Sequence, residues 1–283
     1  MNKLILVTGS NGFTGNYLNK KLNENGFDLI SINCDIANKQ ELQSFVNNIN
    51  PDYVIHLAAI SSVENKDISK FKDVNVKGTN NLLYLLNKKD VLPKLVVLPS
   101  SAQVYSPIKE DHLDECSLIG PSNEYGKSKI EMEKLSKNFD KLPILITRPF
   151  NYTGVGQGSN FLIPKIISHF KLKKNEIELG NIDVKREFND VRDVVNIYIN
   201  LIENVKKSLT VNICSGESYS IREVIKICEK ITRHKIKIKI NDNLKRKLDS
   251  PNIIGNPYKL NSIIGNYKFT KLEKTLEWML SNN

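Results

Sequence analysis

The sequence predicts an α/β protein built on a Rossmann-like, doubly wound parallel sheet, with a smaller α/β lobe beside it. Apolar, strand-like runs alternate with amphipathic, helix-like runs through the first half of the chain. A glycine-rich turn follows the first apolar run, and the regular alternation loosens beyond residue 150. Strands that are apolar on both faces and alternate with helices are typical of a parallel sheet covered by helices on both sides.

The expected elements follow the chain in a β-α-β-α-β rhythm. Continuous apolar runs predict strands at 3–9, 28–32, 53–59, 94–98 and 143–147. The stretches between them predict helices at about 16–26, 38–48, 71–88, 123–140 and 160–173. The run at 233–240 alternates Ile with Lys and predicts a half-buried strand with a solvated lysine face.

Length, composition and charge exclude several classes of protein. With 283 residues, 40% of them hydrophobic, a substantial core is expected and disorder is not. No window holds the roughly 18 apolar residues of a membrane span, and the N-terminus lacks a signal-peptide pattern, which predicts a cytoplasmic protein without a membrane partner. The net charge of +10 comes from dispersed lysines, so no nucleic-acid partner is expected. Four scattered cysteines predict neither disulfides nor a metal site.

The glycine-rich turn VTGSNGFTG lies between the first expected strand and the first expected helix. Gly9, Gly12 and Gly15 permit a tight turn and a close approach of backbone N–H groups to a pyrophosphate, which predicts a dinucleotide site. An acid that binds the adenosine ribose is expected about 20 residues on, which nominates Asp35 for the ribose or the adenine. No Arg or Lys lies between residues 27 and 38 to bind a 2′-phosphate, so the cofactor is NAD or NADP, with a slight preference for NAD.

A tyrosine, a lysine and a serine pair indicate proton-transfer chemistry. Tyr125 and Lys129 are four residues apart and therefore share one face of the expected helix. A lysine ammonium and a nearby nicotinamide cation favour the phenolate, which makes the tyrosine a usable acid or base. The stretch PSSA after strand 94–98 supplies Ser100 and Ser101 to hold the same substrate oxygen.

These motifs together resemble the extended short-chain dehydrogenase/reductase family that acts on nucleotide sugars. The resemblance runs through nearly the whole chain and rests, in order, on TGSNGFTG, HLAA, NVKGTNNLL, SSAQVY, YGKSK, RPFN, REFNDVRD and NICSG. RPFNYTGVGQ and REFNDVRDVV are most similar to the subgroup of GDP-6-deoxy-D-lyxo-4-hexulose reductases and related 4-keto-6-deoxy sugar nucleotide reductases. The resemblance also implies a homodimer.

The resemblance assigns roles to individual residues. It implies a catalytic triad of Ser101, Tyr125 and Lys129. It implies cofactor contacts from Gly9, Asn11, Gly12, Phe13, Gly15, Asp35, Ile36, Leu57, Ala58, Ala59, Asn75, Tyr125 and Lys129. On the substrate side it implies contacts from Ser61, Ser101, Gln103, Asn151, Arg186, Arg246 and Asp249, with the arginines at the diphosphate, whose oxygens match their forked donors. Residues 1–150, with a return segment near 187–214, are expected to form the dinucleotide-binding domain, and 151–186 with 215–283 the substrate-binding lobe.

Three reactions fit this family. A 4,6-dehydratase needs a carboxylate pair directly after the triad serine, where Ala102 and Gln103 stand, so dehydration is disfavoured. The expected activity is NAD(P)H-dependent reduction of the C4 keto group of a GDP- or dTDP-linked 4-keto-6-deoxy sugar. The alternative is a 4-epimerase of the UDP-glucose type, which uses the same triad with a tightly retained NAD. A sugar-nucleotide sensor without activity is disfavoured by the complete triad.

Overall fold

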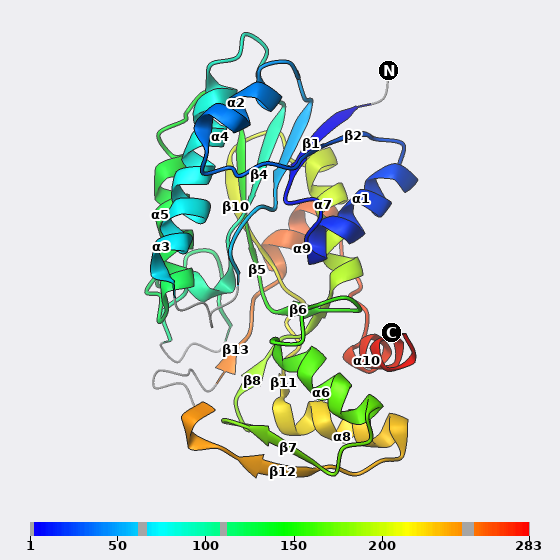
Figure 1. Ribbon diagram of the computed structural model, residues 1–283. Helices are drawn as coiled ribbons and strands as arrows, with labels where there is room; N and C mark the ends of the chain where they lie inside the picture. The colour runs from blue at the N-terminus through cyan, green and yellow to red at the C-terminus, as the bar shows by residue number, and fades with distance from the viewer. Residues whose placement is uncertain (1–2, 62–66, 108–111, 245–251, 283) are drawn as a thin grey trace.

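A six-stranded parallel sheet forms the centre of the larger part of the computed structural model, which describes residues 3–61, 67–107, 112–244 and 252–282 (Figure 1). Its strand order is β10-β5-β4-β3-β1-β2, and every neighbouring pair is parallel. The strands are β1 (Leu4–Thr8), β2 (Asp28–Ile32), β3 (Tyr53–His56), β4 (Leu95–Pro99), β5 (Ile144–Pro149) and β10 (Leu209–Ile213). The predicted Rossmann-like fold is confirmed.

Helices cover both faces of this sheet because its strands are apolar on both faces. Ile5 of β1 packs in one core cluster with helices α1 (Phe13–Glu24), α7 (Val191–Asn204) and α9 (Tyr258–Ile264). Its neighbour Leu6 points to the opposite face, into a cluster with α2 (Lys39–Val46), α4 (Thr79–Asn87) and α5 (Glu124–Ser136). Figure 1 shows these two helical layers on either side of the strands.

The order β2-β1-β3 places the topological switch point between β1 and β3. Strand β2 is the edge of the sheet, and the chain passes from it directly into α2. In open parallel sheets, ligands bind beyond the carboxyl ends of the strands at such a point. The glycine turn after β1 and the segment after β3 meet there.

The helix expected at 71–88 differs from the prediction in its first half. A short α3 (Ile68–Lys70) leads into a π-helical segment, η1 (Phe71–Gly78), and only then into α4. A π-helix closes i to i+5 hydrogen bonds and is frequent at functional sites. An apolar pattern cannot distinguish it from an α-helix, and Asn75 lies in its middle.

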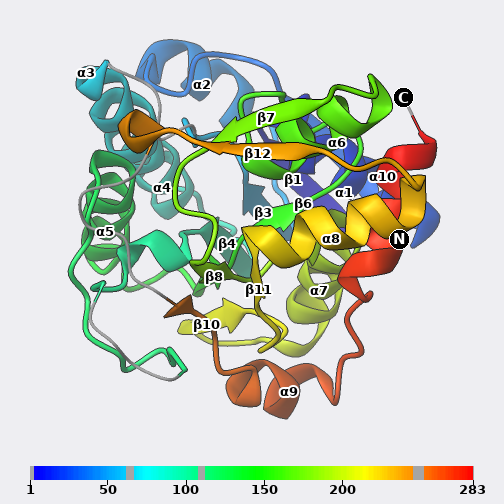
Figure 2. The same cartoon turned by 90° about the horizontal axis from the view of Figure 1, so that it is seen from below.

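The second half builds a smaller lobe with its own apolar core. Helices α6 (Leu162–Lys171), α8 (Ile221–Thr232) and α10 (Leu272–Ser281) surround short strands. Two pairs of strands are β6 (Tyr152–Thr153) with β9 (Asn189–Asp190), and β7 (Glu176–Leu179) with β12 (Lys237–Ile240). A third sheet has β8 (Lys185–Arg186) between β11 (Tyr219–Ser220) and β13 (Asn252–Ile253). Two short 3₁₀ helices lie elsewhere in the chain: η2 (Ala102–Val104) follows β4, and η3 (Asp242–Leu244) follows β12. Figure 2 looks onto this lobe, with β7, β12 and α8 facing the viewer.

The lysine-rich run forms a strand of this lobe. Lys237 and Lys239 of β12 are exposed as predicted, whereas Ile240 is 49% exposed because it ends the strand. Among residues 3–61, 67–107, 112–244 and 252–282, none of the helices has the length and apolar character of a membrane span.

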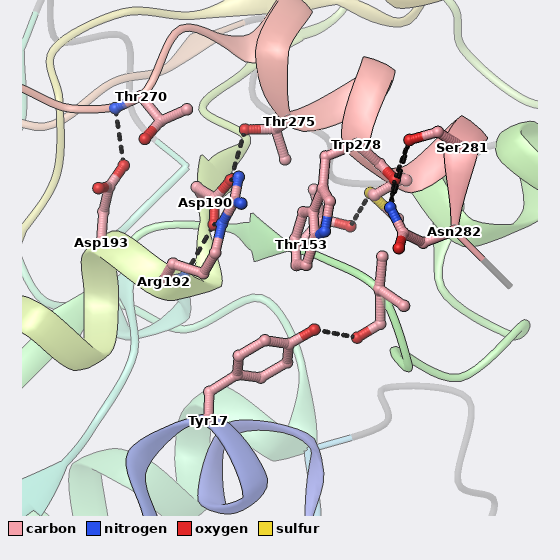
Figure 3. A network of polar contacts seen from close by, with 12 residues as sticks. Tyr17, Thr153, Asp190, Arg192, Asp193, Thr270, Thr275, Trp278, Ser281 and Asn282 are labelled. Carbon is pink, nitrogen blue, oxygen red and sulfur yellow. Dashed lines mark hydrogen bonds and ion pairs between the residues drawn. The ribbon is translucent and has the colours of Figure 1, made fainter. Parts of the chain in front are cut away.

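A network of polar and aromatic contacts connects α10 of the smaller lobe to α7 and α1, which cover the large sheet (Figure 3). The buried carboxylate of Asp190 accepts hydrogen bonds from Arg192 Nε (2.9 Å), Arg192 Nη2 (2.7 Å) and Thr275 Oγ1 (2.8 Å). The Arg192 guanidinium lies 3.8 Å from the centre of the Trp278 ring, and Trp278 meets Tyr17 of α1 edge to face. Helices α1, α7 and α10 are therefore fixed relative to one another.

Candidate active site

The glycine turn after β1 has a shape that only glycine allows. Gly9 has φ of +70°, and a Cβ on it would lie 2.5 Å from the backbone nitrogen of Ala58. A Cβ on Gly15 would lie 2.4 Å from the Ser10 carbonyl oxygen. At Gly9 the turn therefore packs directly against the segment after β3, and at Gly15 helix α1 packs directly against the turn. A side chain at either position would push the two backbones apart.

The N-terminus of α1 fits the pyrophosphate of a dinucleotide. Its N-cap is Gly12, which makes no side-chain cap, and no acidic residue lies in its first turn. Free backbone N–H groups and the positive end of the helix dipole favour an anion at this position. Asn11 and Phe13, two further predicted cofactor contacts, flank this N-cap.

The end of β2 brings forward a residue that the sequence did not single out. Asn33 is the first residue after β2, and its Oδ1 accepts hydrogen bonds from Asn11 Nδ2 (3.1 Å) and Ser10 Oγ (3.3 Å). Asp35 is exposed, and its carboxylate accepts a bond from the nitrogen of Ala37. A search of the sequence for the polar residue directly after the second strand, rather than for an acid, would have identified Asn33.

Ile36 and Asn75 are both buried, and both hold other parts of the site in place. Ile36 packs against Gly78, where an added Cβ would lie 2.6 Å from its Cγ1. Asn75 Oδ1 accepts from Ile60 N (2.8 Å), and its Nδ2 donates to Ile60 O (3.0 Å) and to Ser128 Oγ (2.9 Å). The Asn75 amide thus joins the segment containing Leu57, Ala58, Ala59 and the exposed Ser61 to helix α5.

His56 at the end of β3 is part of a closed chain of hydrogen bonds. The Thr79 hydroxyl donates to Asn75 O (2.7 Å) and therefore accepts from His56 Nε2 (2.9 Å). Ala58 N donates to Thr8 Oγ1 (3.2 Å), whose hydroxyl then donates to His56 Nδ1 (2.7 Å). This arrangement needs a neutral ring, and burial, together with the charge of Lys129, lowers the pKa of His56 to about 3. His56 is therefore a packed residue, and it orders the segment facing the turn.

The predicted triad comes together where η2 meets the first turn of α5. A Cβ on Gly126 would lie 2.3 Å from the Gln103 carbonyl oxygen, so the helix approaches the serine turn as closely as glycine permits. The Ser101 hydroxyl is close enough to the Tyr125 side chain to lower the pKa of its phenol. Lys129 Nζ lies 5.9 Å from the centre of the Tyr125 ring and donates to the Pro99 carbonyl oxygen at 2.7 Å. The structure therefore places Ser101, Tyr125 and Lys129 in one cluster.

Burial dominates the protonation of this cluster. Desolvation raises the pKa of Tyr125 above its usual value of 10, the neighbouring Tyr152 adds to the effect, and the Ser101 hydroxyl partly offsets it. Desolvation also lowers the pKa of Lys129 to about 8, against the raising effect of Glu133. The expected phenolate is thus not favoured by the protein alone, because burial disfavours its charge. Tyr125 is an acid that still carries its proton.

The predicted substrate residues come from separate parts of the chain. Gln103 is in η2, and Asn151, with an exposed side chain, lies between β5 and β6. Arg186 is only 8% exposed on β8, where its Nη1 donates to the Lys185 carbonyl oxygen. Arg246 and Asp249 lie outside the described residues. The part of the chain that the structure describes contains no group of three or more His, Cys, Asp or Glu side chains that could bind a metal ion.

Comparisons with known proteins agree with this geometry. Residues 5–214 match the model of the NAD dependent epimerase/dehydratase family. The chain is 36% identical to GDP-6-deoxy-D-talose 4-dehydrogenase of Aggregatibacter actinomycetemcomitans, over 98% of this chain and 97% of that one. It is 29% identical to GDP-6-deoxy-D-mannose reductase of Pseudomonas aeruginosa, over 100% of this chain and 97% of that one.

A solved structure shares the whole fold. RMD from Pseudomonas aeruginosa, in complex with NADPH, superposes with a TM-score of 0.89 at 28% identity, over 99% of this chain and 97% of that one. The expected resemblance to extended short-chain dehydrogenase/reductases is confirmed, and with it a dependence on NAD or NADP. The chain belongs to the NAD dependent epimerase/dehydratase family.

Proposed function

We propose that this enzyme reduces the C4 keto group of a GDP-linked 4-keto-6-deoxy sugar with NADH or NADPH. One observation carries the proposal: the Ser101, Tyr125 and Lys129 cluster is complete, yet Ala102 and Gln103 follow the serine where dehydration would need carboxylates. Two relatives that span nearly the whole chain are named for redox chemistry on GDP-6-deoxy sugars, one of them at C4, which supports GDP over dTDP.

The protein residues supply the proton and hold the oxygen. The bound cofactor supplies a hydride to C4. The Tyr125 hydroxyl gives its proton to the C4 oxygen as the C–H bond forms, and its raised pKa keeps that proton available at neutral pH. Ser101 hydrogen-bonds the same oxygen, and the Lys129 ammonium stabilises the phenolate that remains. The products are a secondary alcohol and the oxidised cofactor.

The configuration of the product at C4 depends on which face of the keto group receives the hydride. 6-Deoxy-D-talose and 6-deoxy-D-mannose, the sugars of the two relatives, differ only at C4. One keto sugar therefore gives either product, depending on the face of C4 that receives the hydride. That face is set by how the smaller lobe holds the sugar, and we propose that Asn151 and Arg186 bind its diphosphate.

The test is a panel of 4-keto-6-deoxy sugar nucleotides carrying GDP, dTDP, UDP or CDP. Each is incubated with the protein and NADH or NADPH, and the loss of reduced-cofactor absorbance is followed. Oxidation with the GDP-linked substrate is expected, and NMR of the alcohol then gives its configuration at C4. Purified protein that retains NAD, oxidises no cofactor in the panel and interconverts UDP-glucose and UDP-galactose would instead be a 4-epimerase.

The oligomeric state and the cellular location of the protein are also proposed. We propose a homodimer, the arrangement that the family resemblance implies, in the cytoplasm. All four cysteines are free thiols, which suits a reducing compartment. Light scattering on purified protein gives the oligomeric state, and cell fractionation gives the location. The boundaries of the cofactor domain and the substrate-binding lobe also stay a proposal, which limited proteolysis tests.

A further inference from the structure

Two side-chain amides connect the serine turn to the helix that bears Tyr125. Gln103 stands two residues after Ser101, and Asn123 stands two residues before Tyr125 as the N-cap of α5. Asn123 Nδ2 lies 2.8 Å from Gln103 Oε1, and Asn123 Oδ1 lies 2.8 Å from the nitrogen of Gly126. Neither amide takes part in the triad chemistry described above.

These contacts determine which way each amide faces. The nitrogen of Gly126 can only donate, so the Asn123 atom facing it must be the oxygen. The other end of Asn123 is then its NH2 group, which can only donate, so the Gln103 atom facing it must be Oε1. The Gln103 NH2 group is consequently directed away from Asn123. Within the described residues it has no hydrogen-bond acceptor.

We propose that Gln103 is a donor-only contact to an oxygen of the keto sugar, and that Asn123 is the positioning residue that fixes this polarity. The proposal rests on the proposed reductase function and deepens it. A carboxylate at residue 103 would present lone pairs and take up a proton. The amide presents two N–H groups, which suit a keto or hydroxyl oxygen close to the atom that Tyr125 protonates.

The discriminating variant is Asn123→Asp. Asp and Asn cap helices equally well, so the bond to Gly126 and the start of α5 are retained. A carboxylate cannot donate, however, so Gln103 must turn its NH2 toward residue 123 and its Oε1 toward the substrate. We expect kcat/KM for the keto sugar to fall about tenfold or more, while cofactor Kd and Tm stay near wild type.

The control variants separate the effect of turning the Gln103 amide from the effect of placing a negative charge at residue 123. Asn123→Ser keeps a cap but does not fix Gln103, so a smaller loss than for Asn123→Asp is expected. Gln103→Ala should lose about as much kcat/KM as Asn123→Asp, and the double variant should lose little more than Gln103→Ala alone. An Asn123→Asp effect that persists at full size in the Gln103→Ala background would overturn the proposal, because it would be a charge effect on Tyr125.

The wild-type protein distinguishes this inference from the function on which it rests. If wild type oxidises no reduced cofactor with any member of the substrate panel, the reductase function fails. If wild type is active and Asn123→Asp matches it in kcat/KM, the function stands and the donor-only role of Gln103 is wrong.

Discussion

Arg148 of β5 and Glu133 of α5 form a buried, bidentate ion pair, and Glu133 lies one helical turn after Lys129. Arg148 Nε lies 3.0 Å from Glu133 Oε1, and Arg148 Nη2 lies 2.7 Å from Glu133 Oε2. Arg148 Nη1 also donates to the Tyr105 hydroxyl at 3.1 Å. The pair fixes the helix that carries Tyr125 and Lys129 to the sheet beneath it.

Removing one member of this pair is expected to destabilise the protein strongly. Glu133→Leu leaves the Arg148 guanidinium buried without its carboxylate, which should lower the free energy of unfolding by about 3 to 5 kcal/mol. Urea unfolding followed by circular dichroism measures the change. The double variant Glu133→Leu with Arg148→Met should recover most of the loss, because it leaves no isolated charge. A double variant as unstable as the single one would show that the pair contributes through packing.

Tyr125→Phe tests the proton donor. The substitution removes the hydroxyl and keeps the ring, so turnover should fall by about 10² to 10⁴ or more while cofactor binding stays nearly intact. Steady-state kinetics and a fluorescence titration with NADH or NADPH measure the two quantities. Turnover like that of wild type would contradict the assignment of the triad.

Lys129 should reduce stability in a pH-dependent way. Its folded pKa of about 8 lies below the usual 10.5, so charging it in the folded protein costs free energy. The penalty is fully present below pH 8 and disappears as pH rises past 10.5. Lys129→Met, which is inactive by this mechanism, should therefore be more stable than wild type at pH 7 by about 1 to 2 kcal/mol. Urea unfolding at pH 7 and pH 10 should show that difference shrinking, and a difference independent of pH would contradict it.

His56 should contribute to unfolding in acid. Its pKa of about 3 in the folded protein lies below the unfolded value of 6.5, so only the unfolded chain takes up a proton between these values. Stability is therefore lost as pH falls through this window. Between pH 7 and pH 4.5 wild type should lose about 2 kcal/mol more than His56→Gln, measured by urea unfolding. Equal losses in the two proteins would mean that His56 already binds a proton in the folded state.

Asn33 is expected to set the preference between the two cofactors. Asn33→Asp can still accept the bonds from Ser10 and Asn11, but its carboxylate repels a 2′-phosphate, so the ratio of NADH to NADPH kcat/KM should rise about tenfold. Asn33→Arg should shift that ratio toward NADPH. Asp35→Asn is the control, because Asp35 is exposed and its carboxylate is bonded to Ala37. A larger change in the ratio of NADH to NADPH kcat/KM for Asp35→Asn than for Asn33→Asp would show that Asp35, and not Asn33, sets the cofactor preference.

The strands and the glycine turn could be predicted because their physical requirements are local. Buried parallel strands must be apolar on both faces, so β1 to β5 were found near their true bounds, although the run at 53–59 ends as a strand at His56. The proposed triad was predicted from short spacings and a family resemblance, and its three residues lie in one cluster.

The remaining features of the site depend on contacts between distant parts of the chain. The pairs Asn33 with Asn11 and Asn123 with Gln103 are 22 and 20 residues apart, and only the folded chain orients their amides. The raised pKa of Tyr125 in the chain without its cofactor also depends on the fold. A lysine four residues away is visible in the sequence, whereas the burial of the Tyr125 hydroxyl, which raises its pKa most, and the neighbouring Tyr152, which adds to that rise, depend on the fold.

The position of β10 in the large sheet has a consequence for synthesis on the ribosome. Strand β5 gains its second neighbour only when residues 209–213 have emerged, and helix α9 covers that region later still. Until then β5, whose six residues are all buried in the folded protein, is an open edge, the kind of surface that pairs with other chains. The edge of β5 is therefore left uncovered until most of the chain has been translated, and the contact between Trp278 and Tyr17 can form only after the last helix has emerged.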